Sequence, residues 1–439
     1  NFKEGGQLMK KRVLAAFLCM AMVAGLATGC STPGGSKDSG SADGEKVFRY
    51  AVNTLPTTLD PTKGQSIGDN EIQHAVTEGL TRNTAGDVKP GIAEKWDVSD
   101  DGLTYTFHLR KDAKWSDGEP ITAGDYEYSW KRLVNPETAS PYAFIGDCLK
   151  NGQAIEQGKM DVDELGVKAV DDTTLEVTLE HPTSYFLSLI GSSGQFAPLR
   201  KDVVEKNGKN FAATADKNVY SGPFKMTSSE DNVWVFEKNE NYWDKKDIKL
   251  DKCELNYVEN TDTQLSMYES GDLDYVQVPA AYVADYKDKA KEFANGNVDF
   301  CYINSKSDNP VLGNKNFRLA LNYALDRNEY NKLANADTYT AFNGLVFPGL
   351  QAKDSTYGKS YDLNSYSYPL DGNKEKATEY LNAAMKELGI AKASDITVEV
   401  VTTDADTSKR IVETLQELWQ KTLGINIKIR QVTYSDIYG

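Results

Sequence analysis

Residues 103–130, LTYTFHLRKDAKWSDGEPITAGDYEYSW, indicate the fold class, because they place a strand, a turn and a helix start in direct succession. From 103 to 110 apolar and polar residues alternate, which predicts a half-buried strand. Its inward face carries Leu103, Tyr105, Phe107 and Leu109. The sequence Ser116-Asp117-Gly118 then favours a tight turn, since glycine adopts positive φ without steric cost.

A helix is predicted directly after this turn. Thr122 and Asp125 have the spacing of a capping box, in which each side chain satisfies a backbone N–H of the other residue. The next apolar residues follow at helical spacing: Tyr126, Trp130 and Leu133. The segment is therefore predicted to be α/β scaffold, in which Trp115 serves stability and no residue has to touch a ligand.

The run from Arg110 to Trp130 resembles the signature segment of the family 5 extracellular solute-binding proteins, in particular the oligopeptide-binding lipoproteins of bacterial ABC importers. Further segments extend this resemblance from Val47 to the end of the chain. They are Leu59-Asp60-Pro61, NPETASPY at 135–142, YSGPF at 220–224 and NENYW at 239–243. The resemblance implies an α/β fold of the periplasmic-binding-protein kind (type II, three-domain cluster C), with mixed sheets and two lobes about a hinge.

A chain of 439 residues is too long for one ordinary core, so two or three domains are expected. The resemblance divides it into domain I, domain II and an incomplete domain III, whose remainder would follow Gly439. The expected boundaries are 47–89 and 221–304 for domain I, 90–220 for domain II and 305–439 for domain III. The hinge is expected at the two crossings near Lys89–Gly91 and Tyr220–Pro223.

The first 29 residues have the pattern of a secretory signal peptide. Lys10, Lys11 and Arg12 precede an apolar stretch from Val13 to Ala24, which is too short to span a bilayer as a mature helix. The sequence LATGC, which ends at Cys30, resembles the bacterial lipobox, so Cys30 would be the lipidated first residue of the mature protein. The alternative is a signal peptide with an incidental cysteine. Residues 30–46 are rich in Gly, Ser and Asp, which predicts a flexible tether.

Several function classes are disfavoured by composition. A net charge of −16 opposes nucleic-acid binding, which needs a surplus of Lys and Arg. The three histidines have no metal-ligand spacing, and nucleophile-elbow and phosphate-loop motifs are missing from the sequence, so neither a cofactor nor an enzyme is expected. An exported hydrolase is the alternative. The cysteines of the folded body are either buried thiols or include one disulfide: Cys148, Cys253 and Cys301.

The resemblance implies a membrane-anchored, monomeric protein on the extracellular or periplasmic face. It would capture short peptides and hand them to the permease subunits of an ABC transporter, holding the peptide backbone as an added strand. Alternatives within the family are a nickel complex, haem, a sugar or an opine as solute, or a peptide-pheromone receptor.

Ligand contacts are likewise carried over from the family by position. A short strand along the bound peptide would comprise Gln65, Ser66 and Ile67, for which the alternative is a surface loop. Tyr142 would line the cleft, unless it packs against the preceding helix. Positions with weaker correspondence are Gln277, Phe300 and Tyr302. An Asp that pairs with the peptide α-amino group would lie beyond Gly439, so the 439-residue chain is expected to bind peptides weakly or not at all, and a longer form to bind tetra- or pentapeptides.

Overall fold

The structure is a computed structural model that describes residues 44–84, 87–293, 296, 298–344, 346–347, 349–352, 355–356, 368–403, 406–433 and 436. Residues 45–439 form one compact unit, distinct from the first 44 residues. The predicted signal peptide, the predicted lipidation site Cys30 and most of the predicted tether lie outside the described residues. No helix within the described ranges is both long enough and apolar enough to cross a membrane.

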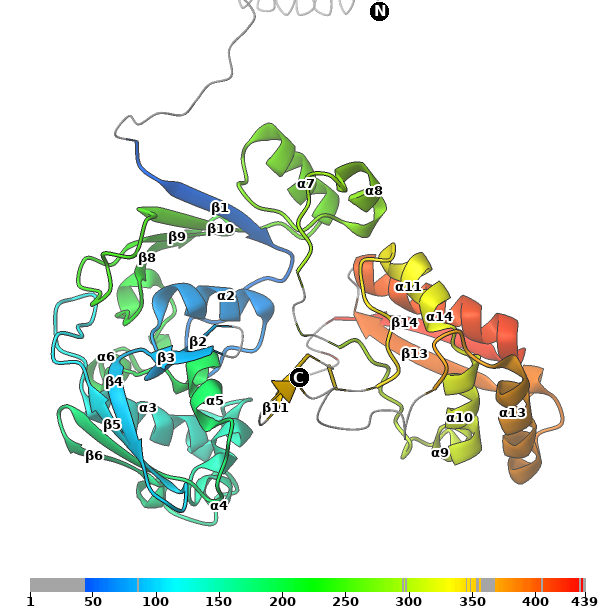
Figure 1. The fold of residues 1–439 in the computed structure, drawn as a ribbon, viewed down its shortest axis with the longest axis horizontal. Coiled ribbons are helices and arrows are strands. Elements are labelled where there is room, and N and C mark those ends of the chain that lie inside the picture. The colour runs from blue at the N-terminus through cyan, green and yellow to red at the C-terminus, as the bar shows by residue number, and fades with distance from the viewer. Residues whose placement is uncertain are drawn as a thin grey trace, which may run out of the picture. The chain divides into compact units, whose positions relative to one another are not determined.

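The first sheet combines parallel and antiparallel pairing (Figure 1). Its strands, in spatial order, are β1 (Val47–Val52), β10 (Lys252–Tyr257), β9 (Val233–Lys238) and β8 (Phe224–Glu230). Strand β1 is parallel to β10, and the other pairs are antiparallel. Helix α2 (Ile67–Val76) and this sheet enclose the first core, a buried apolar cluster to which Ile72 and Val76 of the helix contribute. Strands that are far apart in the sequence therefore enclose one core.

The second sheet is wholly antiparallel. Its order is β4 (Ala93–Val98), β5 (Thr104–Leu109), β7 (Thr174–Thr178) and β6 (Val167–Asp171). A hairpin of β2 (Thr81–Thr84) and β3 (Asp87–Pro90) precedes it. The helices that follow in this part of the chain are α3 (Ala123–Val134), α4 (Gly152–Glu156), α5 (Phe186–Ser192) and α6 (Lys201–Asn207). Apolar side chains from both this sheet and these helices form the second core, which is the largest.

The segment that indicated the fold class behaves as predicted. In β5, Tyr105, Phe107 and Leu109 are buried, whereas the residues between them are half-buried. Gly118 has φ +98°, and its N–H donates to the carbonyl of Trp115 at 2.9 Å. The capping box of α3 is present, and its predicted apolar face is buried: Tyr126, Trp130 and Leu133.

A third core lies in the C-terminal part of the chain. Its elements are α9 (Pro310–Gly313), α10 (Lys315–Ala324), α11 (Arg327–Asn335), α13 (Lys374–Leu388), β13 (Thr397–Thr403), α14 (Asp406–Leu423) and β14 (Asn426–Val432). The sequence predicts strands over 396–401 and 425–430 with a helix over 408–423 between them. Strands β13 and β14 pair in parallel, which confirms this strand–helix–strand unit. The indole of Trp419 on α14 donates to the carbonyl of Leu321 on α10 at 3.0 Å.

The remaining elements are short. They are α7 (Thr261–Ser270), α8 (Val283–Tyr286), β11 (Gln351–Ala352), β12 (Ser355–Thr356) and the 3₁₀ turns η1 (Pro136–Thr138), η2 (Ala143–Cys148), η3 (Val162–Glu164), η4 (Gly194–Phe196), η5 (Gly208–Asn210), η6 (Ala215–Lys217), η7 (Ala280–Tyr282) and η9 (Ala393–Asp395).

Two local predictions were wrong. The helical spacing of Ile72, Ala75, Val76 and Leu80 predicts a helix over 71–80, but α2 runs from Ile67 to Val76 because Ser66 and Asp69 form a capping box there. The sequence over 273–278 predicts a strand, which does not form. Asp274 instead makes one backbone hydrogen bond to β1, and its carboxylate accepts the N–H of Arg49 at 2.7 Å.

Candidate functional site

The loop that leads into α2 is folded around the carboxylate of Asp69. That side chain is completely buried and accepts the backbone N–H groups of Thr57, Thr58, Gln65 and Ser66 at 2.6–3.0 Å. Burial raises the pKa of Asp69, but these four donors outweigh it and hold the pKa below its ordinary value. Asp69 thus fixes the conformation of the loop that carries Gln65.

The predicted contacts Gln65, Ser66 and Ile67 do not form a strand, contrary to expectation. Ser66 is the N-cap of α2, and Ile67 is the first residue of that helix. The N–H groups of Gln65 and Ser66 already donate to Asp69, so they cannot also pair with an added strand. Ser66 is buried, whereas the Gln65 side chain is exposed and that of Ile67 is 63% exposed. Only these two side chains of the three are therefore open to a ligand.

A buried ion pair fastens the same loop to α3. Arg132 donates to both carboxylate oxygens of Asp60, at 2.8 and 2.6 Å, and also to the hydroxyl of Thr62. Asp60 is only 5% exposed, so its charge depends on this partner. The ion pair therefore attaches the Leu59-Asp60-Pro61 segment to helix α3, which belongs to the second core.

The predicted contact Tyr142 is tied to the loop at Thr62. In the segment 135–142, the side chain of Asn135 caps η1 and Ala139 takes a left-handed conformation. Ser140 then donates its hydroxyl to the carbonyl of Thr62 at 2.6 Å and accepts the N–H of Tyr142 at 3.2 Å. The Tyr142 ring is half-buried and lies 5.6 Å from the ring of Phe144, which is 55% exposed. The hydrogen bond from Ser140 thus joins the segment of Tyr142 to the loop that carries Gln65.

The other predicted contacts lie on exposed chain. Gln277 is exposed in the segment beyond α7, and Phe300 and Tyr302 are 69% and 84% exposed in a stretch without helix or strand. Within the described part of the chain, no hydrogen bond or ring contact connects them to Gln65 or Tyr142. The predicted lipidation site Cys30 lies outside the described residues.

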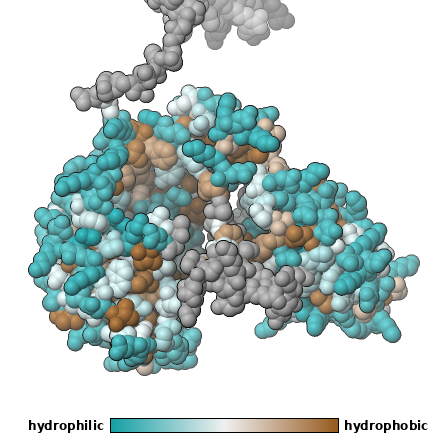
Figure 2. All heavy atoms as spheres, viewed as in Figure 1, coloured by the Kyte–Doolittle hydropathy of each residue, from teal (hydrophilic) through white to brown (hydrophobic). Residues whose placement is uncertain are grey.

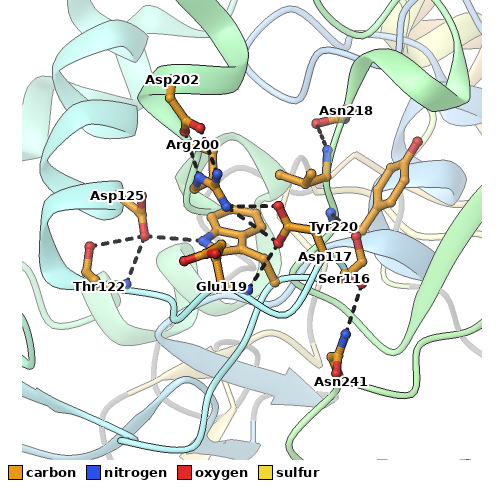
Figure 3. Close-up of polar contacts among 12 residues, drawn as sticks. Ser116, Asp117, Glu119, Thr122, Asp125, Arg200, Asp202, Asn218, Tyr220 and Asn241 are labelled. Carbon is orange, nitrogen blue, oxygen red and sulfur yellow. Dashed lines mark hydrogen bonds and ion pairs between the residues drawn. The ribbon is translucent and has the colours of Figure 1, made fainter.

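The turn after β5 packs against the return of the chain to the first sheet (Figure 3). Ser116 donates its N–H to the carbonyl of Tyr220 at 2.9 Å, and its hydroxyl accepts the N–H of Tyr220 at 3.1 Å. Arg200 donates to Asp117 at 3.1 Å. The indole of Trp115, which is 2% exposed, donates to the capping carboxylate Asp125 at 3.3 Å. The predicted role of Trp115 in the scaffold agrees with this packing.

Residue-by-residue inspection of the sequence missed Asp69 and Arg132. The signal for Asp69 was present, because Ser66 followed three residues later by an acidic residue is a capping pattern. Arg132 offered no such signal, since its partner Asp60 is remote in the sequence.

No reactive constellation is apparent among the described residues. No group of three or more His, Cys, Asp or Glu side chains in them could hold a metal ion. Cys148, Cys253 and Cys301 are free thiols, and burial raises the pKa of Cys148 and of Cys253 to about 11, which disfavours the nucleophilic thiolate. The face drawn in Figure 2 is mostly hydrophilic, with scattered apolar patches.

Comparisons of sequence agree with this geometry. The model of the bacterial extracellular solute-binding proteins, family 5 Middle, matches residues 87–438. The dipeptide-binding protein DppE of Bacillus subtilis is 34% identical over 403 residues, which cover 91% of this chain and 73% of DppE. The oligopeptide-binding protein OppA of the same organism is 32% identical over 434 residues, which cover 96% of this chain and 77% of OppA.

Solved structures give the same result. Listeria monocytogenes OppA bound to peptide superposes with a TM-score of 0.73 at 31% identity, covering 90% of this chain and 78% of that one. The pheromone receptor PrgZ superposes with a TM-score of 0.76 at 30% identity, covering 90% of this chain and 78% of that one. The expected α/β fold of the periplasmic-binding-protein kind is therefore confirmed. The chain belongs to the bacterial extracellular solute-binding proteins of family 5.

Proposed function

We propose that the protein captures short peptides outside the cytoplasm and delivers them to the permease of an ABC importer. The observation that carries this proposal is the similarity, over 90% of the chain, to an OppA whose structure holds a peptide. The dipeptide- and oligopeptide-binding relatives support the same ligand class.

Peptide contact is assigned to side chains that the structure leaves open. Gln65 offers an amide and Ile67 an apolar side chain, while Ser66 positions both as the N-cap of α2. Tyr142 offers an aromatic face with a polar tip. Further contacts would come from Gln277, Phe300 and Tyr302, whose exposure is compatible with this role.

The three-domain division remains part of the proposal. It is supported by the three large buried cores, which involve the first sheet, the second sheet and the C-terminal elements. Domain closure around the peptide would be the signal that a permease reads. In the two crossings first expected to form the hinge, Gly91 and Gly222 donate their N–H groups to the carbonyls of Leu80 and Val76, at 3.0 and 2.9 Å. Bending would therefore be taken up instead by the segment 298–304, which has no helix or strand.

The protein would act as a lipid-anchored monomer through Cys30, with the polar tether holding the folded body away from the membrane. Acyl chains contribute about 0.8 kcal/mol of membrane affinity per buried methylene. Globomycin-sensitive processing and metabolic labelling with a fatty-acid analogue would test the anchor, and a Cys30→Ser variant should lose the label.

A second candidate is reception of peptide pheromones, favoured by the similarity to PrgZ. It uses the same binding chemistry but predicts strong preference for one sequence. Titration with a randomised tetrapeptide pool and with single peptides distinguishes the two: nutrient capture predicts similar affinities across many sequences, and reception predicts one outlier.

The experiment that tests peptide capture is isothermal titration of the protein, expressed from its gene through the natural stop codon, with this tetrapeptide pool. Tyr142→Ala should weaken binding at least fivefold. Tyr185→Ala is the matched control, because Tyr185 is a 62% exposed tyrosine that is not among the predicted contacts, and its removal should change nothing. Equal effects of the two variants on affinity would show that Tyr142 does not contact the peptide.

A further inference from the structure

The 3₁₀ turn η2 sorts its side chains into an inner and an outer face. Residues three apart lie above one another in such a turn, because it has three residues per turn. Ala143, Gly146 and Leu149 follow this period, and all three are buried. Phe144 is offset from them by one residue and is 55% exposed. A large aromatic side chain therefore lies on the outer face of η2.

The backbone that carries Phe144 is fixed at both ends of its turn. A Cβ added to Gly146 would lie 2.5 Å from Cγ1 of Val134, at the end of α3, so only glycine allows this close packing. On the other side, the carbonyl of Cys148 accepts the N–H of Glu180 at 2.9 Å. The turn thus has its conformation before a ligand arrives, which lowers the entropy cost of binding.

The ring of Phe144 continues the surface of Tyr142. The centres of the two rings lie 5.6 Å apart with 31° between the ring planes, and the N–H of Ile145 donates to the carbonyl of Tyr142 at 3.1 Å. Ser140 in turn bonds the segment of Tyr142 to Thr62 in the loop that carries Gln65. The exposed ring is therefore continuous with the side chains to which peptide contact was assigned above.

Asp147 gives this aromatic surface an acidic border. It follows Phe144 by three residues and so lies on the same face of η2. Its Oδ1 atom is buried and has no hydrogen-bond partner in the described part of the chain. Burial and then the charge of Asp147 raise the pKa of Glu156, on α4. An acidic group placed against Phe144 would consequently be repelled.

We propose that Tyr142, Phe144 and Asp147, named here the aromatic subsite, accept one apolar side chain of the bound peptide and disfavour an acidic one. The proposal rests on the peptide capture proposed above and adds to it a preference at one position of the peptide. Phe144 is the specificity-determining residue of the subsite, and Asp147 supplies the discrimination against acidic side chains.

The physical reason is the apolar area that a ligand can cover. An exposed aromatic ring on a soluble protein marks a place where binding removes apolar surface from water, and the gain grows with the area removed. A leucine side chain laid on Phe144 covers more of the ring than an alanine side chain does. Specificity also requires that wrong ligands be penalised, which the carboxylate of Asp147 does for acidic side chains.

Isothermal titration of the protein expressed through its natural stop codon tests the subsite. The ligands are tetra-alanine and the four peptides in which leucine replaces one of its alanines. One leucine peptide should bind at least fivefold more tightly than tetra-alanine. Phe144→Ala should remove this advantage and should bind tetra-alanine within twofold of the wild type.

Two controls separate recognition from folding. Phe144→Leu keeps an apolar side chain and should retain most of the leucine advantage, and Tyr185→Ala, which removes another exposed ring, should retain all of it. The urea midpoint of Phe144→Ala should equal that of the wild type, because the ring is mainly exposed. A lowered midpoint with all five peptides weakened equally would show that Phe144 acts through the fold, and would overturn the subsite.

The role of Asp147 is tested at the same peptide position. Glutamate there should bind at least threefold more weakly than alanine, and Asp147→Asn should remove this penalty while keeping the leucine advantage. A penalty that persisted in Asp147→Asn would overturn the role of Asp147.

The remaining outcomes distinguish the subsite from peptide capture. Equal affinity of the wild type for all five peptides, or an unchanged leucine advantage in Phe144→Ala, would overturn the subsite and leave peptide capture intact. If the wild type binds none of the five peptides, peptide capture and the subsite both fail.

Discussion

Replacing Asp69 by Asn should unfold the protein at markedly lower urea concentration. Asp69 is the centre of the loop that presents Gln65 and Ile67, and its two carboxylate oxygens divide the donors between them. One oxygen accepts the N–H groups of Thr57 and Thr58, at 2.6 and 3.0 Å. An Asn side chain keeps only one acceptor oxygen and turns an NH₂ group toward the remaining donors.

The other oxygen accepts the N–H groups of Gln65 and Ser66, both at 2.9 Å, and the hydroxyl of Thr57 at 3.0 Å. Whichever way the amide is turned, two backbone donors lose their partner. Each unsatisfied buried donor costs about 1–3 kcal/mol, so the expected loss is about 2–6 kcal/mol.

Urea unfolding followed by tryptophan fluorescence measures this loss in the relevant part of the chain, because five of the six tryptophans precede residue 250. Asp101→Asn is the matched control. Asp101 also accepts a backbone N–H and a hydroxyl, from Leu103 and Ser99, but in an exposed turn. Because solvent can replace these partners, the free energy of unfolding of Asp101→Asn should fall much less than that of Asp69→Asn. Equal midpoints for the two variants would refute the assigned role of Asp69.

The same side chain predicts a pH dependence. The pKa of Asp69 is lower in the folded protein than in the unfolded chain, so its stabilising contribution is complete above the unfolded pKa, about 4. The contribution is lost as pH falls through the folded pKa. The stability difference between wild type and Asp69→Asn should therefore shrink below about pH 4 and stay constant between pH 5 and 7. A difference that grew on acidification would contradict this sign.

Four further substitutions test the scaffold by the same unfolding assay. Trp115→Ala should cost about 3–5 kcal/mol because it empties a buried indole site, and the ranking of peptide ligands should not change; normal stability with an altered ranking would place Trp115 in the binding site. Gly222→Ala should cost about 1–3 kcal/mol, since its Cβ would meet backbone at 2.5 Å, whereas Gly124→Ala in α3, with its nearest neighbour at 3.5 Å, should stabilise by about 0.5–1 kcal/mol. Arg132→Met should cost about 3–5 kcal/mol by leaving the buried Asp60 unpaired, and a loss below 1 kcal/mol would show that Asp60 does not depend on it.

Local patterns explain which parts of the fold were predictable. The alternation in β5 and the capping box of α3 are signals carried by neighbouring residues, and both proved accurate. The strand–helix–strand unit of β13, α14 and β14 was predictable for the same reason.

The errors have non-local causes. The residues Gln65, Ser66 and Ile67 were assigned to a strand by likeness of position, but the Asp69 carboxylate binds their backbone and starts a helix. The segment 273–278 looks like a strand by composition, yet only one backbone hydrogen bond joins Asp274 to β1. The carboxylate of Asp274, and not its backbone carbonyl, accepts the N–H of Arg49.

The contacts of the site depend on pairs that are far apart in the sequence. Arg132 with Asp60, and Ser140 with Thr62, join residues about seventy positions apart or more. Neither member of such a pair reveals its partner in one sequence. Crossings were predicted near Gly91 and Gly222 from likeness, but the chain already passes from the first core at Val76 to the second core at Leu80. The bonding of Gly91 and Gly222 to the carbonyls of Leu80 and Val76 was not visible in the sequence.

The most direct test of peptide capture is titration of the natural-length protein with the randomised tetrapeptide pool, alongside nickel, haem and a sugar panel. We expect saturable heat with the peptide pool alone, at one peptide per protein. Tyr142→Ala should weaken this binding at least fivefold, and Tyr185→Ala should leave it unchanged. Saturable binding of a non-peptide solute with no response to the pool would contradict it.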